Sequence, residues 1–405
     1  MSKFDPKDSN EEALDPEAGN IILAMVKQFS KDMDLSRVTF PTFVLEPRSF
    51  TERVTDFMTH PDVLLDAASQ ENEIDRFIQV TKYYLSGWHI HPRGVKKPYN
   101  PVLGEFFRCR YSFEDDSRSF YISEQVSHHP PITAMYYNNP QHGIRINGEL
   151  RPISRFFGNS VAMMLDSKSY GKIYLDSHGE EYNITYPNMY ARGILFGKMF
   201  LELGEKSTVI CEKSNLQCEV EFKTKGFFTG SYNQIEGKIT TISEPRETLY
   251  HISGNWQTVT YIKNVKTDET TVLFDSSQES VMLKDVPKID DQEPNESRNL
   301  WRHVTVALKN KDQDAATTEK TKIEEAQREA ARTRRAQKIQ WSQRFFSHDA
   351  EKDIYLPKIC IDDNEIDALP SDPEEAGNIL TQWIFTKPDG SIPEFVKDDE
   401  SSVPC

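Results

Sequence analysis

The stretch SFYISEQV, residues 119–126, sets the pattern for the middle of this chain. Between residues 101 and 283, β-rich segments of this kind alternate with Gly, Asn, Asp and Ser turns. The other segments are GIRINGEL (143–150), KIYL (172–175), YNIT (182–185), CEVEF (218–222), GKITTI (237–242) and TVLF (271–274). Many short strands without intervening helices predict an antiparallel sheet large enough to curl into a barrel.

Helical patterns flank this region. Residues 50–90 and the segment ESRNLWRHVTVALKN (296–310) are helical in character, and a long polar helix is expected at about 314–341. The sequence therefore predicts a mainly β fold with flanking helices.

A further helix is expected near the N-terminus. Asp15, Pro16 and Glu17 supply an N-cap, a proline at the first helical position and an acid in the first turn. The apolar residues that follow form one stripe: Ile21, Ile22, Met25, Val26 and Phe29. Two interpretations remain open, a helix packed on the core or an amphipathic lid over an apolar opening.

Composition narrows the function classes. The chain has 405 residues, of which 37% are hydrophobic and 11% aromatic, so it has the composition of a globular protein. No apolar run reaches the roughly 18 residues of a membrane span, and the polar start MSKFDPKDSNEE is unlike a signal peptide. The five cysteines form no CxxC pair, which favours reduced thiols in a cytosolic protein.

Charge is unevenly distributed. The net charge is −16, and residues 349–405 alone contain 15 acidic and 4 basic residues. In contrast, residues 81–110 contain six Lys or Arg and one Glu. A basic island in an acidic protein indicates a localised anionic ligand, whereas nucleic acid would require a broad basic face.

The motif EQVSHHPP, residues 124–131, places two histidines before two prolines. A zinc site would need further ligands, and only Glu124 is near in sequence; adjacent side chains on a strand also point to opposite faces. No nucleophile motif accompanies the histidines, so no catalytic residue is assigned. A polar strand end and a phosphate-binding site remain as alternatives.

The segment GVKKPYNPVLGE, residues 94–105, favours phosphate binding. It places Lys96, Lys97 and Asn100 in a loop stiffened by two prolines. Lysine supplies a point charge, and the asparagine amide supplies a hydrogen-bond donor. Histidine supplies N–H groups and gains positive charge beside an anion.

Together, EQVSHHPP and KKPYNPVLGE resemble the signature pair of the oxysterol-binding-protein-related lipid-transfer family. The resemblance covers roughly residues 15–385 and includes FFGNSVAMM (156–164), YNITYPNMYARGILFGKM (182–199), ISGNWQTVTYI (252–262) and QREAARTRR (327–335). It implies an incomplete antiparallel β-barrel that encloses a lipid tunnel closed by an N-terminal lid, formed here by the stripe from Ile21 to Phe29.

The resemblance also implies a site for phosphatidylinositol 4-phosphate at the tunnel mouth. Its expected residues are Lys97, Asn100, His128, His129, Lys320, Glu324 and Arg328. The last three are spaced by four residues and so share one helical face, which from the residues alone is typical of a solvated, salt-bridged surface. Glu324 is expected to orient the two cations or to accept a hydrogen bond from an inositol hydroxyl.

The second lipid is expected to be phosphatidylserine, because KKPYNPVLGEFFRC and DLSRVTFPTFVLEP are similar to the branch of the family that carries it. The residues that the resemblance assigns to this lipid are Lys97, Asn100, Ser154 and Phe40. A sterol in its place is the alternative within the family.

Along the chain, the expected division is into five segments: tail and lid (1–30), a helical segment leading into the barrel (31–97), the barrel (98–285), C-terminal helices (286–346) and an acidic C-terminal segment (347–405). The resemblance implies a cytoplasmic lipid exchanger that is not an enzyme and needs no cofactor or metal. Its expected partners are the two lipids, anionic membranes contacted transiently at endoplasmic reticulum or plasma membrane contact sites, and a membrane-tether protein. A phosphoinositide sensor and a histidine-dependent phosphoinositide hydrolase are the rival classes.

Overall fold

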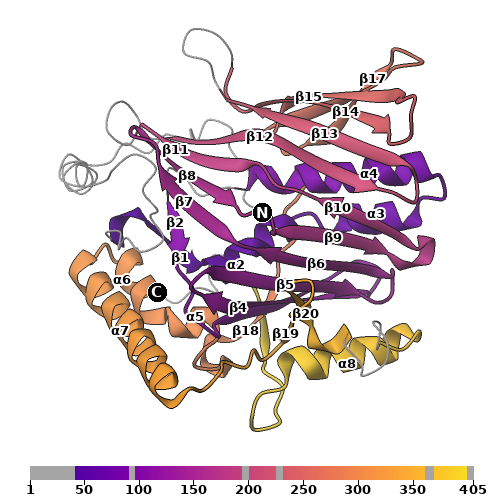
Figure 1. Cartoon of the computed structure of the whole chain (residues 1–405). Helices are drawn as coiled ribbons and strands as arrows, with labels where there is room; N and C mark the ends of the chain where they lie inside the picture. The colour runs from indigo at the N-terminus through magenta and orange to yellow at the C-terminus, as the bar shows by residue number, and fades with distance from the viewer. Residues whose placement is uncertain (1–41, 91–95, 194–199, 225–230, 361–368, 399–405) are drawn as a thin grey trace. The chain divides into compact units, whose positions relative to one another are not determined.

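The computed structural model of the chain describes residues 42–90, 96–193, 200–224, 231–360 and 369–398 (Figure 1). The predicted lid residues Ile21, Ile22, Met25, Val26 and Phe29 lie outside these ranges, and so does Phe40. The described residues fall into two compact units. Unit 1 takes its described residues from Asp56–Lys96 and Pro152–Met282, and unit 2 from Phe40–Thr55, Lys97–Arg151 and Leu283–Cys405.

The described part of unit 1 contains two α-helices and a large antiparallel sheet. Its helices are α3 (Asp62–Ser69) and α4 (Glu73–Ser86). Its strands are β7 (Pro152–Phe156), β8 (Ser160–Leu165), β9 (Tyr170–Leu175), β10 (Glu180–Ile184), β11 (Asn188–Arg192), β12 (Phe200–Cys211), β13 (Leu216–Lys223), β14 (Gln234–Thr241), β15 (Thr248–Asn255), β16 (Val259–Asn264) and β17 (Thr270–Asp275).

The strands of unit 1 pair in the order β7–β8–β11–β12, and β12 to β17 then follow in chain order. The hairpin β9–β10 joins this sheet at the far end of β12, where Asn183 lies opposite Ile210. Helix α4 begins at Asn72, whose side-chain oxygen accepts hydrogen bonds from the N–H groups of Ile74 and Asp75. Such a cap satisfies helix-end donors that would otherwise be unpaired.

Unit 2 combines a β-meander with most of the helices. Its strands are β1 (Leu45–Ser49), β2 (Lys97–Tyr99), β3 (Phe106–Ser112), β4 (Arg118–His128), β5 (Pro131–Asn139), β6 (Ile144–Leu150), β18 (Asp285–Pro287), β19 (Phe346–Asp349), β20 (Ile354–Pro357) and β21 (Phe395–Lys397). Its helices are α2 (Phe50–Arg53), α5 (Ser297–Leu300), α6 (Arg302–Lys309), α7 (Gln313–Gln337) and α8 (Pro373–Phe385).

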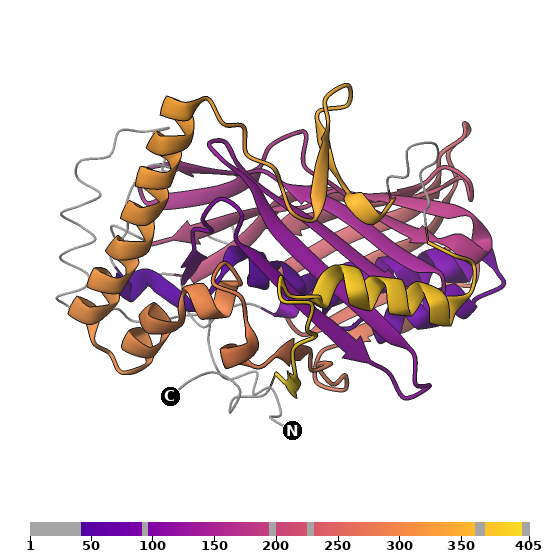
Figure 2. The same cartoon turned by 90° about the horizontal axis from the view of Figure 1, so that it is seen from below.

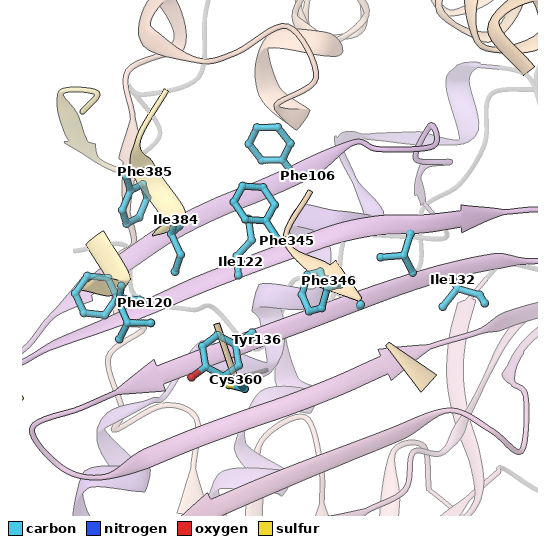
Figure 3. Close-up of a cluster of buried hydrophobic side chains, with 13 residues drawn as sticks. Phe106, Phe120, Ile122, Ile132, Tyr136, Phe345, Phe346, Cys360, Ile384 and Phe385 are labelled. Carbon is cyan, nitrogen blue, oxygen red and sulfur yellow. The ribbon is translucent and has the colours of Figure 1, made fainter. Parts of the chain in front are cut away.

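The meander of unit 2 runs β3–β4–β5–β6, and β18 and β21 extend it beyond β3. One face is covered by the C-terminal part of the chain. Figure 3 shows Phe345, Phe346 and Ile384 gathered with side chains of β3, β4 and β5, and all of them are buried. Each large side chain buried in this way contributes about 1.5–3 kcal/mol to stability.

Helix α8 belongs to the segment that the sequence indicates only as acidic. It begins with Asp372 as N-cap and Pro373 at the first helical position, and it lies along the strands near β4 (Figure 2). Residues 373–385 and 395–397 are therefore folded parts of unit 2, although the segment is rich in carboxylates.

The predicted fold class is confirmed: the protein is mainly β, with a large antiparallel sheet that stays open within each unit and with flanking helices. All seven β-rich segments quoted above fall on strands. Among the described residues, none of the helices combines the length and the apolar character needed to cross a membrane. The five-segment division along the chain remains a prediction, and the two units interleave these segments.

Candidate anion-binding site

Three segments of unit 2 carry the seven residues predicted to bind a phosphate. Lys97 and Asn100 lie at β2 and in the loop after it, while His128 and His129 lie where β4 ends. The remaining three, Lys320, Glu324 and Arg328, lie on α7 (Figure 1).

The loop after β2 is anchored by the buried carboxylate of Glu105. Its Oε2 accepts hydrogen bonds from the Val102 N–H (3.0 Å) and from the indole N–H of Trp301 (2.9 Å). Its Oε1 accepts one from the Ser297 hydroxyl at 2.8 Å. Burial raises the pKa of Glu105, and these donors act in the opposite direction. A carboxylate bound on both oxygens gives the loop a fixed end, from which the side chains of Lys97 and Asn100 are positioned.

The same loop is joined to α7 and to the segment after it. The Leu103 N–H donates to Oε1 of Gln327, a residue of α7, at 2.7 Å. Gly104 has a φ of +78°, and a Cβ built there would lie 2.3 Å from the indole of Trp341. Only glycine allows both the left-handed backbone and this close approach.

His128 is oriented by the loop. Its Nδ1 lies 2.9 Å from the carbonyl oxygen of Pro101. Because a carbonyl can only accept, Nδ1 carries the proton and the neutral tautomer is fixed. Burial lowers the His128 pKa to about 4, with a smaller effect of His129 in the same direction; Glu324 acts to raise it. The His128 imidazole is therefore neutral at pH 7 in this structure.

His129 lies beside His128 because β4 ends between them. Their ring centroids are 4.6 Å apart at an interplanar angle of 71°. The pairing of β4 with β5 shifts between Gln125 and Ser127, and β4 ends at His128, so His129 belongs to the turn. The expectation that adjacent side chains point to opposite faces applies to regular strands, and a bulge and a turn remove it here.

The α7 residues form one continuous ion-pair chain. Lys320 Nζ lies 2.7 Å from Glu324 Oε1, and Arg328 lies 3.5 Å from Glu324 Oε2. Lys320 is buried, whereas the Arg328 side chain is 55% exposed. An ammonium group is rarely buried without a partner, and Glu324 is that partner. Glu324 thus holds a buried cation at one end of the face and an exposed one at the other.

Lys97 lies within electrostatic range of this helix. Burial, and after it the positive charge of Lys320, lower the Lys97 pKa to about 8, and Glu324 opposes both effects. Lys97 and His128 are thus both within electrostatic range of Glu324, and Lys97 is also within range of Lys320. Three cations against one carboxylate give the site a net positive charge suited to an anion with several oxygens.

Metal binding does not fit the histidine pair. Glu124 is the nearest carboxylate in sequence, and both of its oxygens accept backbone hydrogen bonds, from Arg344 and Phe345, each at 2.8 Å. Among the residues that the structure describes, no group of three His, Cys, Asp or Glu side chains could hold a metal ion. Glu124 instead fixes the start of the segment that covers the β4 face.

The other predicted residues are Asn100, Ser154, Phe40 and the lid stripe. Asn100 follows β2 directly and its side chain is exposed. Ser154 belongs to unit 1, where it lies on β7 opposite Met163 of β8. Phe40 and the lid stripe lie outside the described residues, so their roles stay predictions.

Sequence reasoning assigned no role to Glu105, Gln327 or Gly104, which shape the loop. Glu105 and Gly104 stand inside the quoted motif KKPYNPVLGE, and Gln327 opens the quoted stretch QREAARTRR. Their presence in these motifs was a usable signal. The partners that explain them are distant in sequence, so no local pattern revealed them.

Comparison with known proteins agrees with this geometry. The family model described as oxysterol-binding protein matches residues 21–364. The chain belongs to the oxysterol-binding protein family. One relative, an oxysterol-binding protein homolog of Schizosaccharomyces pombe, is 45% identical over 361 residues, which are 86% of this chain and 75% of that protein.

Solved structures of family members share the fold. The Osh1 ORD domain in complex with ergosterol gives a TM-score of 0.67 at 24% identity, covering 82% of this chain and 84% of that one. The Osh3 ORD of Saccharomyces cerevisiae in complex with PI(4)P gives 0.63 at 20% identity, covering 86% and 91%. Both likenesses concern the fold. Membership of a lipid-transfer family, together with the cationic cluster, defines the class of function to be considered.

Proposed function

We propose that this chain is a lipid carrier that exchanges phosphatidylinositol 4-phosphate for phosphatidylserine between membranes, without chemical turnover of either lipid. The cationic cluster of Lys97, Lys320 and Arg328 around Glu324, with the two histidines beside it, carries the proposal. A phosphomonoester has several acceptor oxygens and up to two negative charges, which match donors arriving from three separate segments. The PI(4)P complex of the structurally similar Osh3 ORD supports the same ligand.

Transfer follows from the energetics of acyl chains. Exposing a chain to water costs about 0.8 kcal/mol per CH₂ group, which is prohibitive for two chains. The tunnel that the family resemblance implies would move the chains between two apolar environments. Two lipids that compete for one tunnel are exchanged at each membrane visit, and the headgroup site selects by charge.

The second lipid is the finer part of the proposal. Similarity to the phosphatidylserine-carrying branch supports phosphatidylserine, with Ser154 of β7 as the residue that reads its headgroup. A sterol is the second candidate, since structurally similar Osh1 ORD domains are complexes with ergosterol and with cholesterol. We place the carrier in the cytoplasm, in transient contact with anionic membranes at endoplasmic reticulum contact sites, where a tether protein would hold it.

The decisive experiment replaces both histidines. His128→Ala combined with His129→Ala should weaken phosphatidylinositol 4-phosphate extraction from liposomes by about two orders of magnitude or more, at about 1.5–3 kcal/mol for each charge-assisted contact. His142→Ala is the matched control, because this histidine belongs to the same unit but bonds Asp115 at 2.6 Å. Normal extraction by the double variant would refute the assignment of the site.

A liposome assay separates the rival functions. A carrier moves both lipids between donor and acceptor vesicles, a sensor binds without transfer, and a hydrolase releases inorganic phosphate. Ser154→Ala should reduce phosphatidylserine extraction while phosphatidylinositol 4-phosphate extraction persists. Efficient sterol transfer with no phosphatidylserine transfer would favour the second candidate.

A further inference from the structure

The hydrogen bond between His128 and Pro101 has a consequence for the charge of the ligand. The Nδ1–H of His128 is committed to the Pro101 carbonyl at 2.9 Å. In a neutral imidazole the other ring nitrogen, Nε2, then carries a lone pair and no proton. A lone pair repels a phosphate oxygen, so His128 contacts a phosphate favourably only if one more proton is present at the contact.

This extra proton can be on the His128 imidazole or on the phosphate. In both cases the complex holds one proton more than the neutral imidazole and the dianion together. If solvent protonates Nε2, the imidazolium donates N–H to a phosphate oxygen. If the phosphomonoester is a monoanion, its P–O–H donates to the Nε2 lone pair. A phosphomonoester loses its second proton near pH 6, so at pH 7 most of the free ligand is the dianion and one proton must be taken from solvent on binding.

We propose that His128 makes binding of a phosphomonoester headgroup proton-coupled, so that the protein takes up about one proton per headgroup bound and selects a monoester over a diester. The inference rests on the proposed function, because it concerns the same site. A phosphodiester has no proton to donate and only one negative charge with which to draw a proton onto Nε2. The only phosphate of phosphatidylserine and of phosphatidylinositol is a diester, so both lipids lack the monoester that would engage His128.

The charged groups around His128 agree with this assignment. His129 follows His128 on the same segment. Glu324 of α7 faces His128, and Lys320 and Arg328 are the ion-pair partners of that carboxylate. Lys97 of β2 is, like His128, within electrostatic range of Glu324, and its pKa of about 8 leaves it mostly protonated at pH 7. Burial keeps His128 neutral until an anion arrives, and a dianion beside it favours the imidazolium.

Proton uptake by Lys97 and proton uptake through His128 can be distinguished by their pH dependence. Uptake by Lys97 is confined to about pH 7 and above, because below that it is already charged. Uptake through His128 operates between the second pKa of the phosphate, near 6, and higher pH. Over that range the affinity should rise by up to about tenfold for each unit by which the pH falls.

The experiment is isothermal titration calorimetry at pH 7.0 in two buffers of different ionisation enthalpy, which measures protons taken up per ligand bound. The probes are dioctanoyl phosphatidylinositol 4-phosphate, its deacylated form glycerophosphoinositol 4-phosphate, in which the 1-phosphate stays a diester, and dioctanoyl phosphatidylinositol, which carries a diester only. We expect about one proton with both monoesters for the wild-type chain. The diester should give none.

Three variants locate the proton. His128→Gln places a non-titrating N–H donor where Nε2 stood, and His128→Asn keeps only the donor to Pro101; both should lower the uptake to half or less. Lys97→Arg keeps a permanent cation and should leave the proton count unchanged.

Two results would overturn the inference while the proposed function stands: monoester binding to the wild-type chain without proton uptake, or full uptake in both His128 variants. Absence of monoester binding at every pH would overturn the proposed function and this inference together.

Discussion

Helices α7 and α8 begin alike and end up in opposite environments. Each starts at an aspartate whose carboxylate accepts a backbone N–H in the first turn, Asp312 from Ala315 and Asp372 from Glu375. Helix α8 then buries Leu380, Ile384 and Phe385 in 13 residues, whereas the 25 residues of α7 bury only Ala316 and Lys320.

This difference in burial indicates that α8 contributes to the stability of unit 2, whereas α7 contributes to its binding site. Helix α8 closes the apolar cluster on β3, β4 and β5, so its side chains stabilise the fold. Helix α7 is held by its cap, by Gln327 and by contact of Ile323 with the cluster around Trp301, and most of its surface stays polar. A helix with so little burial is free to present charge, and its ion-pair face belongs to the candidate site.

The largest effect should come from α8. Leu380→Ala removes a fully buried side chain and should lower the free energy of unfolding by about 2–5 kcal/mol. Its neighbour Ile379 is exposed, so Ile379→Ala is the control and should change stability by about 0.5 kcal/mol or less. Urea unfolding measures both, and equal effects would show that α8 is no part of the core. Lipid extraction at low temperature should persist in both variants.

A smaller loss of stability is expected in the loop after β2, which Glu105 anchors. In Glu105→Gln, an amide NH₂ at the position of Oε2 would face two donors, the Val102 N–H and the Trp301 indole, and at the position of Oε1 it would face the Ser297 hydroxyl. In both orientations the anchor loses its negative charge. Unfolding free energy should fall by about 1–3 kcal/mol, and phosphatidylinositol 4-phosphate binding should weaken because the loop loses its anchor. Glu114→Gln, at an exposed position, is the control. Unchanged binding in a destabilised Glu105 variant would show that the anchor does not position the site.

The two helices also show what sequence could and could not predict. The polarity of α7 and the spacing of Lys320, Glu324 and Arg328 were visible, and the family resemblance gave them a role. The N-terminal signature of α8, Asp372–Pro373–Glu374, was equally visible but was obscured by the acidic composition around it. Its apolar face is defined by packing on β4, a contact across more than two hundred residues, which no local pattern shows.

The same limit applies inside the site. The motifs indicated His128 and Lys97, but not that Lys320 is buried or that Pro101 fixes the His128 tautomer. Both facts depend on which segments the sheet brings together. Regular strand geometry even suggested that the side chains of the two histidines point apart. The alternation of side chains along a strand does not show that β4 has a bulge and ends at His128.

A third prediction tests α7 directly. Lys320→Met keeps the buried stem and removes the charge, so phosphatidylinositol 4-phosphate binding should weaken by about 1.5–3 kcal/mol. The double variant with Glu324→Gln removes the partner as well. If the loss came only from an unpaired Glu324, the double variant would recover binding; we expect it to recover stability alone. Thermal unfolding together with liposome extraction measures the two quantities.

The smallest effect should lie at the exposed end of α7. Arg328 and Arg332 are four residues apart and so follow one another on the same helix face, about 6 Å along the axis. Arg328 pairs with Glu324 at 3.5 Å, whereas Arg332 pairs with Glu329 at 2.9 Å and its side chain is 72% exposed. Arg328→Ala should weaken phosphatidylinositol 4-phosphate binding by about threefold to tenfold, as expected for a largely exposed charge, and Arg332→Ala should leave it unchanged.

Salt sharpens this last comparison. An exposed charge is screened at high ionic strength, so the effect of Arg328→Ala should shrink between 0.05 and 0.5 M salt, whereas that of Lys320→Met should persist because Lys320 is buried. Binding at several salt concentrations checks both. If Arg332→Ala proved as damaging as Arg328→Ala, with both effects vanishing in salt, α7 would act as a broad basic surface toward anionic membranes. If binding is weakened only by the changes at Lys320 and Arg328, then headgroup recognition on α7 ends about one turn beyond Glu324, at Arg328, the last residue with which Glu324 forms an ion pair.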